Sequence, residues 1–187
     1  MNQKLKSALT KIIDTEIVVS QKKDAYKSIH MIENVYGVDL PSDYKEFLLE
    51  YGGSFIKDNI MYKPIEITPI THKDGFDSIG GFYGITDDNY NIESVIKTYK
   101  DVLGKVLMPI ADADGGDLLC IGIKGQYKDK IYYWHHEGEA SKDGKEYVYL
   151  IANSFEEFIL KFTPHQREQN VNLDDIELFL DEDLLKD

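Results

Sequence analysis

Residues 36–53 read YGVDLPSDYKEFLLEYGG, and they decide the fold because they contain the end of one helix and the whole of the next. Gly37 tolerates the left-handed conformation in which helices often end. Pro41 suits the first turn of a helix, and Ser42 or Asp43 can satisfy the free N–H groups there. The apolar face of the helix that begins here consists of Tyr44, Phe47, Leu48 and Tyr51 at helical spacing. The stretch therefore predicts a helix end, a turn and a second helix that stops at Gly52-Gly53.

Two helical patterns precede and adjoin this stretch. The helix that ends at Gly37 can be capped by Ser20, and a shorter helix is predicted within residues 1–20. The apolar stripe of the longer helix is Ala25, Ile29, Ile32 and Tyr36. Both patterns have the period of an amphipathic helix packed on a core.

After Gly53 the sequence changes to short strand-like segments separated by turns. Edge strands are expected between Ile56 and Ile67, a short strand at Phe82–Ile85 and a helix from Asn91 to Val102. The best strand predictions are Val106–Ala111, Leu118–Ile123 and Ile131–Trp134, with a further strand at Tyr147–Ile151. Leu118–Ile123 is apolar on both faces, which places it centrally in the sheet.

A last helix opens at the capping box Ser154–Glu157 and stops at Pro164. The predicted fold class is therefore α+β, with N-terminal helices followed by a mainly antiparallel β-sheet and helices packed on it.

The chain has 187 residues, of which 42% are hydrophobic, so it can bury the core of one ordinary domain. It carries 21 Lys+Arg against 34 Asp+Glu, a formal net charge of −13. This balance argues against binding to nucleic-acid phosphates and favours basic proteins or small molecules as ligands.

The one cysteine, Cys120, lies in an apolar run and predicts a buried, reduced thiol in a cytoplasmic protein. The sequence contains no apolar stretch of about 18 residues, so it predicts no membrane span.

The segment Asp112–Asp117 reads DADGGD and begins like a calcium-binding EF-hand loop, with carboxylates at its first and third positions. The remaining positions do not fit. An EF-hand loop has an oxygen ligand at its fifth position and glycine at its sixth, but here Gly116 is fifth and Asp117 is sixth. Ile123 stands at the position of the bidentate glutamate. A tight Gly-Gly turn between two core strands is the better prediction, with aspartate side chains capping the N–H groups of the turn.

The segment Trp134-His135-His136-Glu137 raises the question of a zinc site. Neighbouring residues of a strand point to opposite faces, so His135 and His136 cannot both bind one ion without leaving the strand. No HExxH or CxxC motif completes a ligand set. Local hydrogen bonding is therefore the predicted role of these histidines.

Sequence motifs for nucleophilic catalysis or phosphate binding are absent, including GxSxG, GxxxxGK[ST] and GxGxxG. The apolar flanks of Cys120 predict burial and not activation. A hydrolase or a metal-dependent enzyme would need Asp112, Asp114 and Asp117 to converge in a pocket. We predict no enzyme activity, no catalytic residue, no cofactor and no metal.

The aromatic content, which includes 13 tyrosines, leaves two interpretations open. In one interpretation they belong to a protein-binding surface, for which tyrosine among acidic residues is typical. In the other they simply lie at the border of the hydrophobic core. The residues in question are Tyr62, Tyr83, Tyr90, Tyr127, Tyr133 and Tyr147.

Five motifs follow one another in the order of a known family. After residues 36–53 come Phe82-Tyr83-Gly84, Met108–Ala111 with Asp114–Asp117, Tyr133–Glu137, and Ser154–Phe158. Together they resemble the SUKH family, the Smi/Knr-like proteins, from about Ala25 to Phe162. Each motif alone is weak, but five in sequence are specific. The chain departs from the family in having Tyr51 where an asparagine usually precedes Gly52-Gly53.

The resemblance divides the chain into three parts. Residues 1–24 are an N-terminal helical extension, and residues 25–163 are a SUKH-like domain. Residues 164–187 form an acidic linker and an amphipathic helix, in which eight acidic residues against two basic ones give a net charge of −6. The two ends have no counterpart in the family.

The resemblance implies an α+β fold and, in bacteria, an immunity protein that silences a toxin domain, often a nuclease. Fungal relatives are linked to cell-wall regulation through protein partners. A nuclease is basic where it meets phosphate, so an acidic inhibitor is attracted to that surface. We predict an immunity protein for a basic nuclease toxin, with no direct nucleic-acid or membrane binding. The alternative is an adaptor or regulatory protein-binding domain without a toxin partner.

The expected contact surface combines acids that face toxin lysines and arginines with aromatic anchors. The predicted partner-binding residues are Tyr83, Asp112, Asp114, Asp117, Trp134, His136, Glu137 and Glu139.

Overall fold

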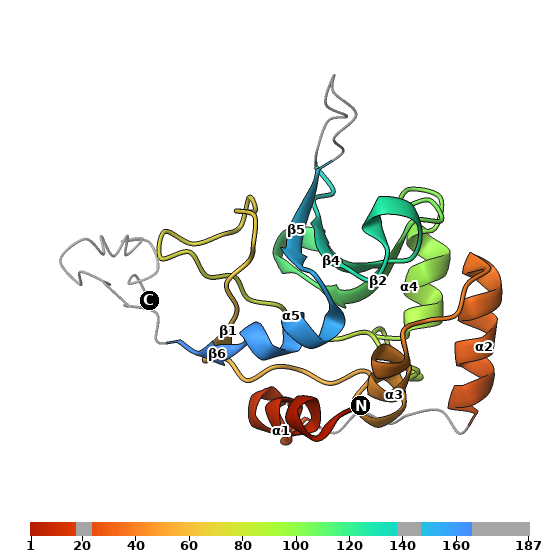
Figure 1. Ribbon diagram of the computed structural model, residues 1–187, viewed down its shortest axis with the longest axis horizontal. Helices are drawn as coiled ribbons and strands as arrows, with labels where there is room; N and C mark the ends of the chain where they lie inside the picture. Colours follow the sequence, from red (N-terminus) through yellow and green to blue (C-terminus); the bar gives the residue numbers. More distant parts are fainter. Residues whose placement is uncertain (18–23, 138–146, 166–187) are drawn as a thin grey trace, which may run out of the picture.

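The computed structural model describes residues 1–17, 24–137 and 147–165, which form an α+β fold (Figure 1). The helices are α1 (Gln3–Ile12), α2 (Ala25–Tyr36), α3 (Ser42–Glu50), α4 (Ile92–Tyr99) and α5 (Phe155–Lys161). The strands are β1 (Ile60–Met61), β2 (Leu107–Asp112), β3 (Leu118–Gly122), β4 (Ile131–Trp134), β5 (Val148–Ala152) and β6 (Thr163–Pro164). The 3-10 turns η1 (Asp114–Gly116) and η2 (Gly125–Tyr127) flank β3. The predicted fold class is confirmed.

The main sheet is antiparallel and has the strand order β2-β3-β4-β5, while β1 and β6 pair separately. Every residue of β3 is buried, which confirms the central position predicted from its apolar faces. The strand register places Asp112, Leu118, Trp134 and Val148 in one row across the sheet. This row forms one edge of the sheet, where β2 and β4 both end.

Helices cover the sheet and contact one another (Figure 1). α4 packs on β2, α5 packs on β5, and α3 contacts both α2 and α5. α1 packs on α5 through a face that includes the fully buried Leu5 and Leu9. The helices and the sheet therefore share one hydrophobic core. The division of the chain into extension, domain and tail stays a prediction.

A buried acid holds the stretch 36–53 together. Glu33, near the end of α2, is only 9% exposed. Its Oε1 accepts hydrogen bonds from the Leu40 N–H and the Lys45 ammonium, both at 3.0 Å. Burial favours a raised pKa, but the two donors outweigh it and hold the pKa of Glu33 below its ordinary value. Because Gly37 takes the predicted left-handed conformation (φ 65°), the chain can turn there and bring Leu40 and Lys45 back to Glu33.

The glycines after α3 lie against a second glycine of the later motif. A Cβ atom on Gly84 would stand 2.2 Å from the backbone nitrogen of Gly53 and 2.2 Å from the carbonyl carbon of Gly52. No side chain can be accommodated at such a distance, so the close approach requires glycine at position 84. The motifs at 36–53 and 82–84 therefore touch through their backbones.

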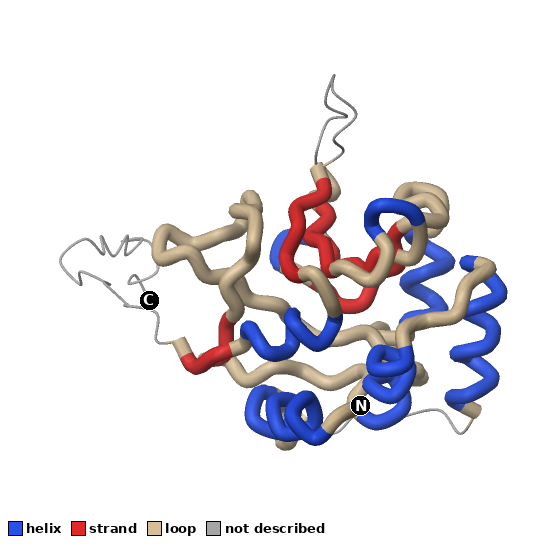
Figure 2. The backbone as a smooth tube through the Cα atoms, viewed as in Figure 1, coloured by secondary structure: helices blue, strands red, loops and turns tan. Residues whose placement is uncertain are grey.

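Several predicted segments differ in detail from the structure. Phe82–Ile85 is not a strand, because its residues form only single bridges, such as Phe82 with Ala111. Between Ile56 and Ile67 only β1 is a regular strand, and most of this region is irregular (Figure 2). Ser42 and Asp43 make no capping bond at the start of α3, whereas Ser154 caps α5 as predicted. Ser20 lies outside the described residues.

Of the helices that the structure describes, none combines the length and the apolar character needed to cross a membrane.

Candidate functional site

The candidate site lies just beyond the row Asp112, Leu118, Trp134 and Val148. Here η1 leads from β2 into β3, and β4 ends next to the beginning of β5 (Figure 1). Because Leu118 pairs with Trp134 in antiparallel strands, the residue before Leu118 lies opposite the residues after Trp134. The register therefore brings Asp117 close to the two histidines.

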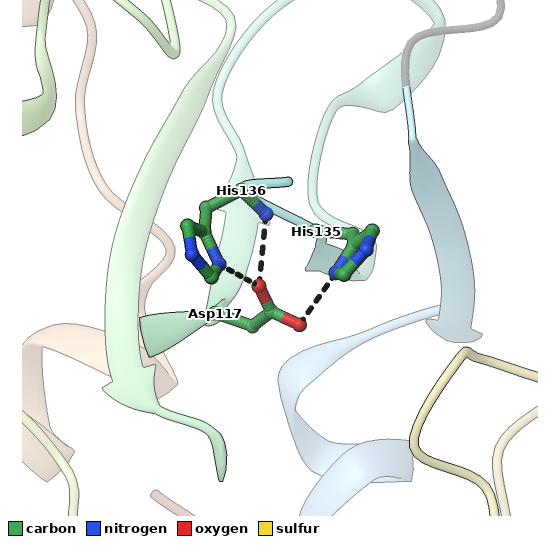
Figure 3. A group of neighbouring side chains, drawn as sticks. All are labelled: Asp117, His135 and His136. Carbon is green, nitrogen blue, oxygen red and sulfur yellow. Dashed lines mark hydrogen bonds and ion pairs between the residues drawn. The ribbon is translucent and has the colours of Figure 1, made fainter. Parts of the chain in front are cut away.

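The Asp117 carboxylate binds both imidazole rings (Figure 3). Its Oδ2 lies 2.8 Å from His135 Nδ1, and its Oδ1 lies 2.6 Å from His136 Nδ1. The backbone N–H of His136 also donates to Oδ1 at 2.8 Å, and the Tyr133 hydroxyl donates to Oδ2. Four hydrogen bonds thus surround the carboxylate, whose side chain is only 3% exposed.

These hydrogen bonds decide the charge of Asp117. Burial favours a raised pKa, but the donors from Tyr133, His136 and His135 outweigh it and hold the pKa of Asp117 below its usual value. The carboxylate is therefore ionised at neutral pH and can only accept hydrogen bonds. Each imidazole must carry a proton on Nδ1 to donate to it, so the Nε2 atom of a neutral ring is left as an acceptor.

His135 and His136 lie beyond the strand, which is the condition under which the sequence allowed both side chains to approach one group. β4 ends at Trp134, so the strict alternation of a strand no longer applies to the two residues that follow. Both rings turn toward Asp117. The His136 ring lies over Gly116, because its Cε1 would be only 3.6 Å from a Cβ atom added at Gly116. The predicted role in local hydrogen bonding is confirmed.

Asp112 faces a different set of donors. Its carboxylate accepts from the Gly81 N–H through Oδ1 and from the Tyr90 hydroxyl at 3.1 Å through Oδ2. Burial and the neighbouring Asp112 charge raise the pKa of Tyr90 to about 12. A Cβ on Gly80 would stand 2.6 Å from Oδ2, so the absence of a side chain at Gly80 leaves room for this carboxylate.

The tight Gly-Gly turn predicted at Asp112–Asp117 is confirmed. Gly115 and Gly116 have positive φ values of 76° and 92°, and the Ala113 N–H closes the turn on the Asp117 carbonyl at 3.0 Å. The predicted capping is wrong for Asp112 and Asp117, because both side chains reach to other segments. These two carboxylates accept hydrogen bonds from different residues, and the side chain of Asp114 lies outside the described part of the structure.

The other predicted partner-binding residues differ in exposure. Tyr83 is buried, while Trp134 is half-buried and packs edge-on against Tyr99 at 5.9 Å between ring centroids. The Glu137 side chain is 74% exposed. Glu139 lies outside the described residues. A binding role for any of these residues stays a prediction.

Sequence reasoning missed the contributions of Tyr133 and Tyr90 to these two networks. Tyr133 is one of the six tyrosines for which the sequence leaves open a binding surface or the rim of the core, and it is buried, as are Tyr62 and Tyr83. Cys120 is fully buried as predicted, and burial raises the pKa of its thiol well above the ordinary value. The site therefore offers two imidazoles and an ionised carboxylate, a set that can hold protons or a metal ion.

Comparison with known proteins places this arrangement in context. The sequence matches the family SUKH_6, described as SMI1-KNR4 cell-wall, over residues 26–159. It is also 36% identical over 165 residues to the SPbeta prophage-derived uncharacterized protein YokK of Bacillus subtilis (strain 168). That alignment covers 82% of this chain and 83% of the relative.

Proposed function

Because the chain belongs to the SUKH family, we propose that it is an immunity protein that binds a toxin domain of the nuclease type and blocks it. Membership of the family over residues 26–159 is the observation that carries this proposal. The net charge of −13 supports it, since a nuclease must be basic where it binds phosphate. On this proposal the protein acts by occupying the toxin and contributes no chemistry of its own.

We assign the contact to an acidic edge made of Asp87, Asp88, Asp112 and Glu137. Asp88 Oδ1 accepts from the Tyr90 N–H at 2.8 Å, and the Tyr90 hydroxyl donates to Asp112 at 3.1 Å. The loop that carries Asp87 and Asp88 is therefore tied to the end of β2. Glu137 follows the histidine pair at the end of β4, on the same edge of the sheet.

Aromatic and buried groups give this acidic edge a defined shape. Trp134 and Tyr99 pack on each other beside it and offer a half-buried apolar anchor. Asp117 and Tyr83 are buried, so in this proposal they support the surface and make no direct contact with the toxin. Charge at the edge would accelerate association, and burial of the aromatic rings would slow dissociation.

The experiment is a growth assay in which this protein is co-expressed with the product of each neighbouring gene. We expect one neighbour to arrest growth alone, growth to return when the protein is present, and the two proteins to co-purify. Glu137→Lys should weaken rescue, because it reverses a charge at the acidic edge. Asp58→Lys, an equal change at an exposed site beside β1, is the matched control. If no neighbour is rescued, the proposal fails.

The adaptor function is the second candidate, favoured by the family description, which refers to the cell wall. An adaptor would use the same surface for a partner encoded elsewhere. Deleting its gene would then change cell physiology without releasing a toxin, whereas an immunity gene cannot be deleted while its toxin is active. The viability of the single deletion, compared with deletion of both neighbouring genes, separates the two functions.

A further inference from the structure

We propose that Asp117, His135 and His136 form a binding site for a divalent first-row transition-metal ion. One ligand atom from each residue lies within 4.8 Å of the others, although the residues come from two different strand ends. Figure 3 shows both rings turned toward the carboxylate from opposite sides. An ion could therefore reach all three groups after small side-chain movements.

The chemistry of the donors selects the class of metal. Two imidazole nitrogens and one carboxylate oxygen suit Zn²⁺, Fe²⁺, Co²⁺ or Ni²⁺. Ca²⁺ and Mg²⁺ prefer sites built from oxygen ligands, and this cluster provides too few. Three protein ligands also leave coordination positions for water, as in metal sites that stay open to solvent.

Burial is graded across the cluster in the way that such a site needs. The Asp117 side chain is 3% exposed, that of His135 is 23% exposed and that of His136 is 38% exposed. The carboxylate thus forms the floor, while the two imidazoles form a rim that solvent can reach. An ion could enter from outside without opening the core.

Outer hydrogen bonds already fix the carboxylate. The Tyr133 hydroxyl and the His136 N–H donate to the two oxygens of Asp117, and neither donor would be a metal ligand. Partners of this kind orient ligands and commonly tune metal affinity. Glu137 Oε1 lies 3.9 Å from His136 Nε2, and after a small side-chain movement it could accept a hydrogen bond from the Nε2–H when Nδ1 binds the ion.

When the ion binds, each neutral imidazole ring keeps one proton, but that proton is on Nε2 and no longer on Nδ1. Each Nδ1–H now donates to Asp117, and coordination through Nδ1 requires that its proton leave to solvent while Nε2 takes one up. The two rings would change tautomer when the ion binds. This change gives a spectroscopic signature that ordinary surface binding would not produce.

The test is a calorimetric titration of the tag-free full chain with ZnCl₂. We expect one ion per chain, no heat of binding with MgCl₂ or CaCl₂, and a ¹H–¹⁵N spectrum in which Nδ1 of both rings loses its proton. His135→Gln and His136→Gln should each weaken zinc binding by roughly tenfold or more, and Tyr133→Phe by roughly tenfold through the outer shell.

The matched control is His165→Gln, which removes an imidazole–carboxylate pair elsewhere in the protein, His165 Nε2 with Asp74 Oδ2 at 2.8 Å. It should leave zinc affinity unchanged. Thermal melting shows that each variant is folded, and the partly exposed His135 and His136 are the variants expected to fold normally. No zinc binding by the wild type, or a zinc affinity in both histidine variants equal to that of the wild type, would overturn the site. The titration needs no toxin, so its outcome is separate from that of the immunity proposal.

Discussion

Two buried carboxylates, Glu33 and Asp117, are stabilised by converging donors. A buried charge costs several kcal/mol unless hydrogen bonds replace its lost water. Glu33 obtains them from a backbone N–H and a lysine, and Asp117 obtains them from a tyrosine, two imidazoles and a backbone N–H. In both cases the acid joins segments that are separate in the fold. Each acid is therefore expected to matter for stability independently of any partner.

Glu33→Gln should lower the free energy of unfolding by about 1–3 kcal/mol at pH 7, because two charge-assisted hydrogen bonds weaken. The pKa of Glu33 is lowered in the folded protein, so its stabilising effect is present above the unfolded pKa and is lost as pH falls through the folded pKa. Urea denaturation between pH 7 and pH 3 should show the difference from wild type shrinking with acid. A difference that grows toward low pH would contradict this account. Exposed Glu16→Gln is the control.

Asp117→Asn should destabilise the fold by roughly 2–4 kcal/mol, because the amide replaces an acceptor by a donor amid four donors. The mechanism is local, so Asp58→Asn at an exposed site should change stability little. Thermal unfolding measured by circular dichroism compares the two variants. Equal melting temperatures for Asp117→Asn and the wild type would show that the network adds no stability.

Periodicity sufficed to predict the helices and the main-sheet strands. The i, i+3, i+4 pattern in Tyr44, Phe47 and Leu48 reports burial directly, and all three are buried. The segment 82–85 could not be predicted correctly, because its bridges depend on neighbours from distant parts of the chain. The meeting of Asp117 with both histidines also required the register of β3 on β4 and the point where β4 ends. The alternation of side chains along a strand predicts neither this register nor the residue at which β4 ends.

Gly84→Ala should destabilise the protein by about 3 kcal/mol or more, because its Cβ would overlap the backbone at Gly52 and Gly53. Gly104→Ala is the matched control, since Gly104 has a positive φ of 61° but no atom within 4 Å of the added Cβ. That control should cost only about 1–2 kcal/mol of backbone strain. Denaturant unfolding measures both variants, and a smaller loss at Gly84 than at Gly104 would refute the backbone contact.

Across the whole molecule, acidity and fold carry different information. The fold follows from a core that extends from α1 to α5. The acidic residues behind the charge of −13 include Asp87, Asp88, Asp112 and Glu137, the four residues of the acidic edge. The proposed immunity function rests on the family, and the charge supplies the physical reason why a basic partner would be attracted.

The association rate with the toxin should fall roughly tenfold or more between low and high salt, because screening weakens long-range attraction. Stopped-flow mixing at several ionic strengths measures this rate. The double variant Asp88→Asn and Glu137→Gln keeps the shapes of both side chains and should show a flatter dependence on salt. An equally steep dependence in that variant would place the contact on another surface.

The most direct test of the immunity proposal is a titration of the purified neighbouring toxin with this protein, with nuclease activity as the readout. The account predicts that activity falls in proportion to added protein and reaches zero at one molar equivalent. Full nuclease activity in the presence of excess protein would contradict it.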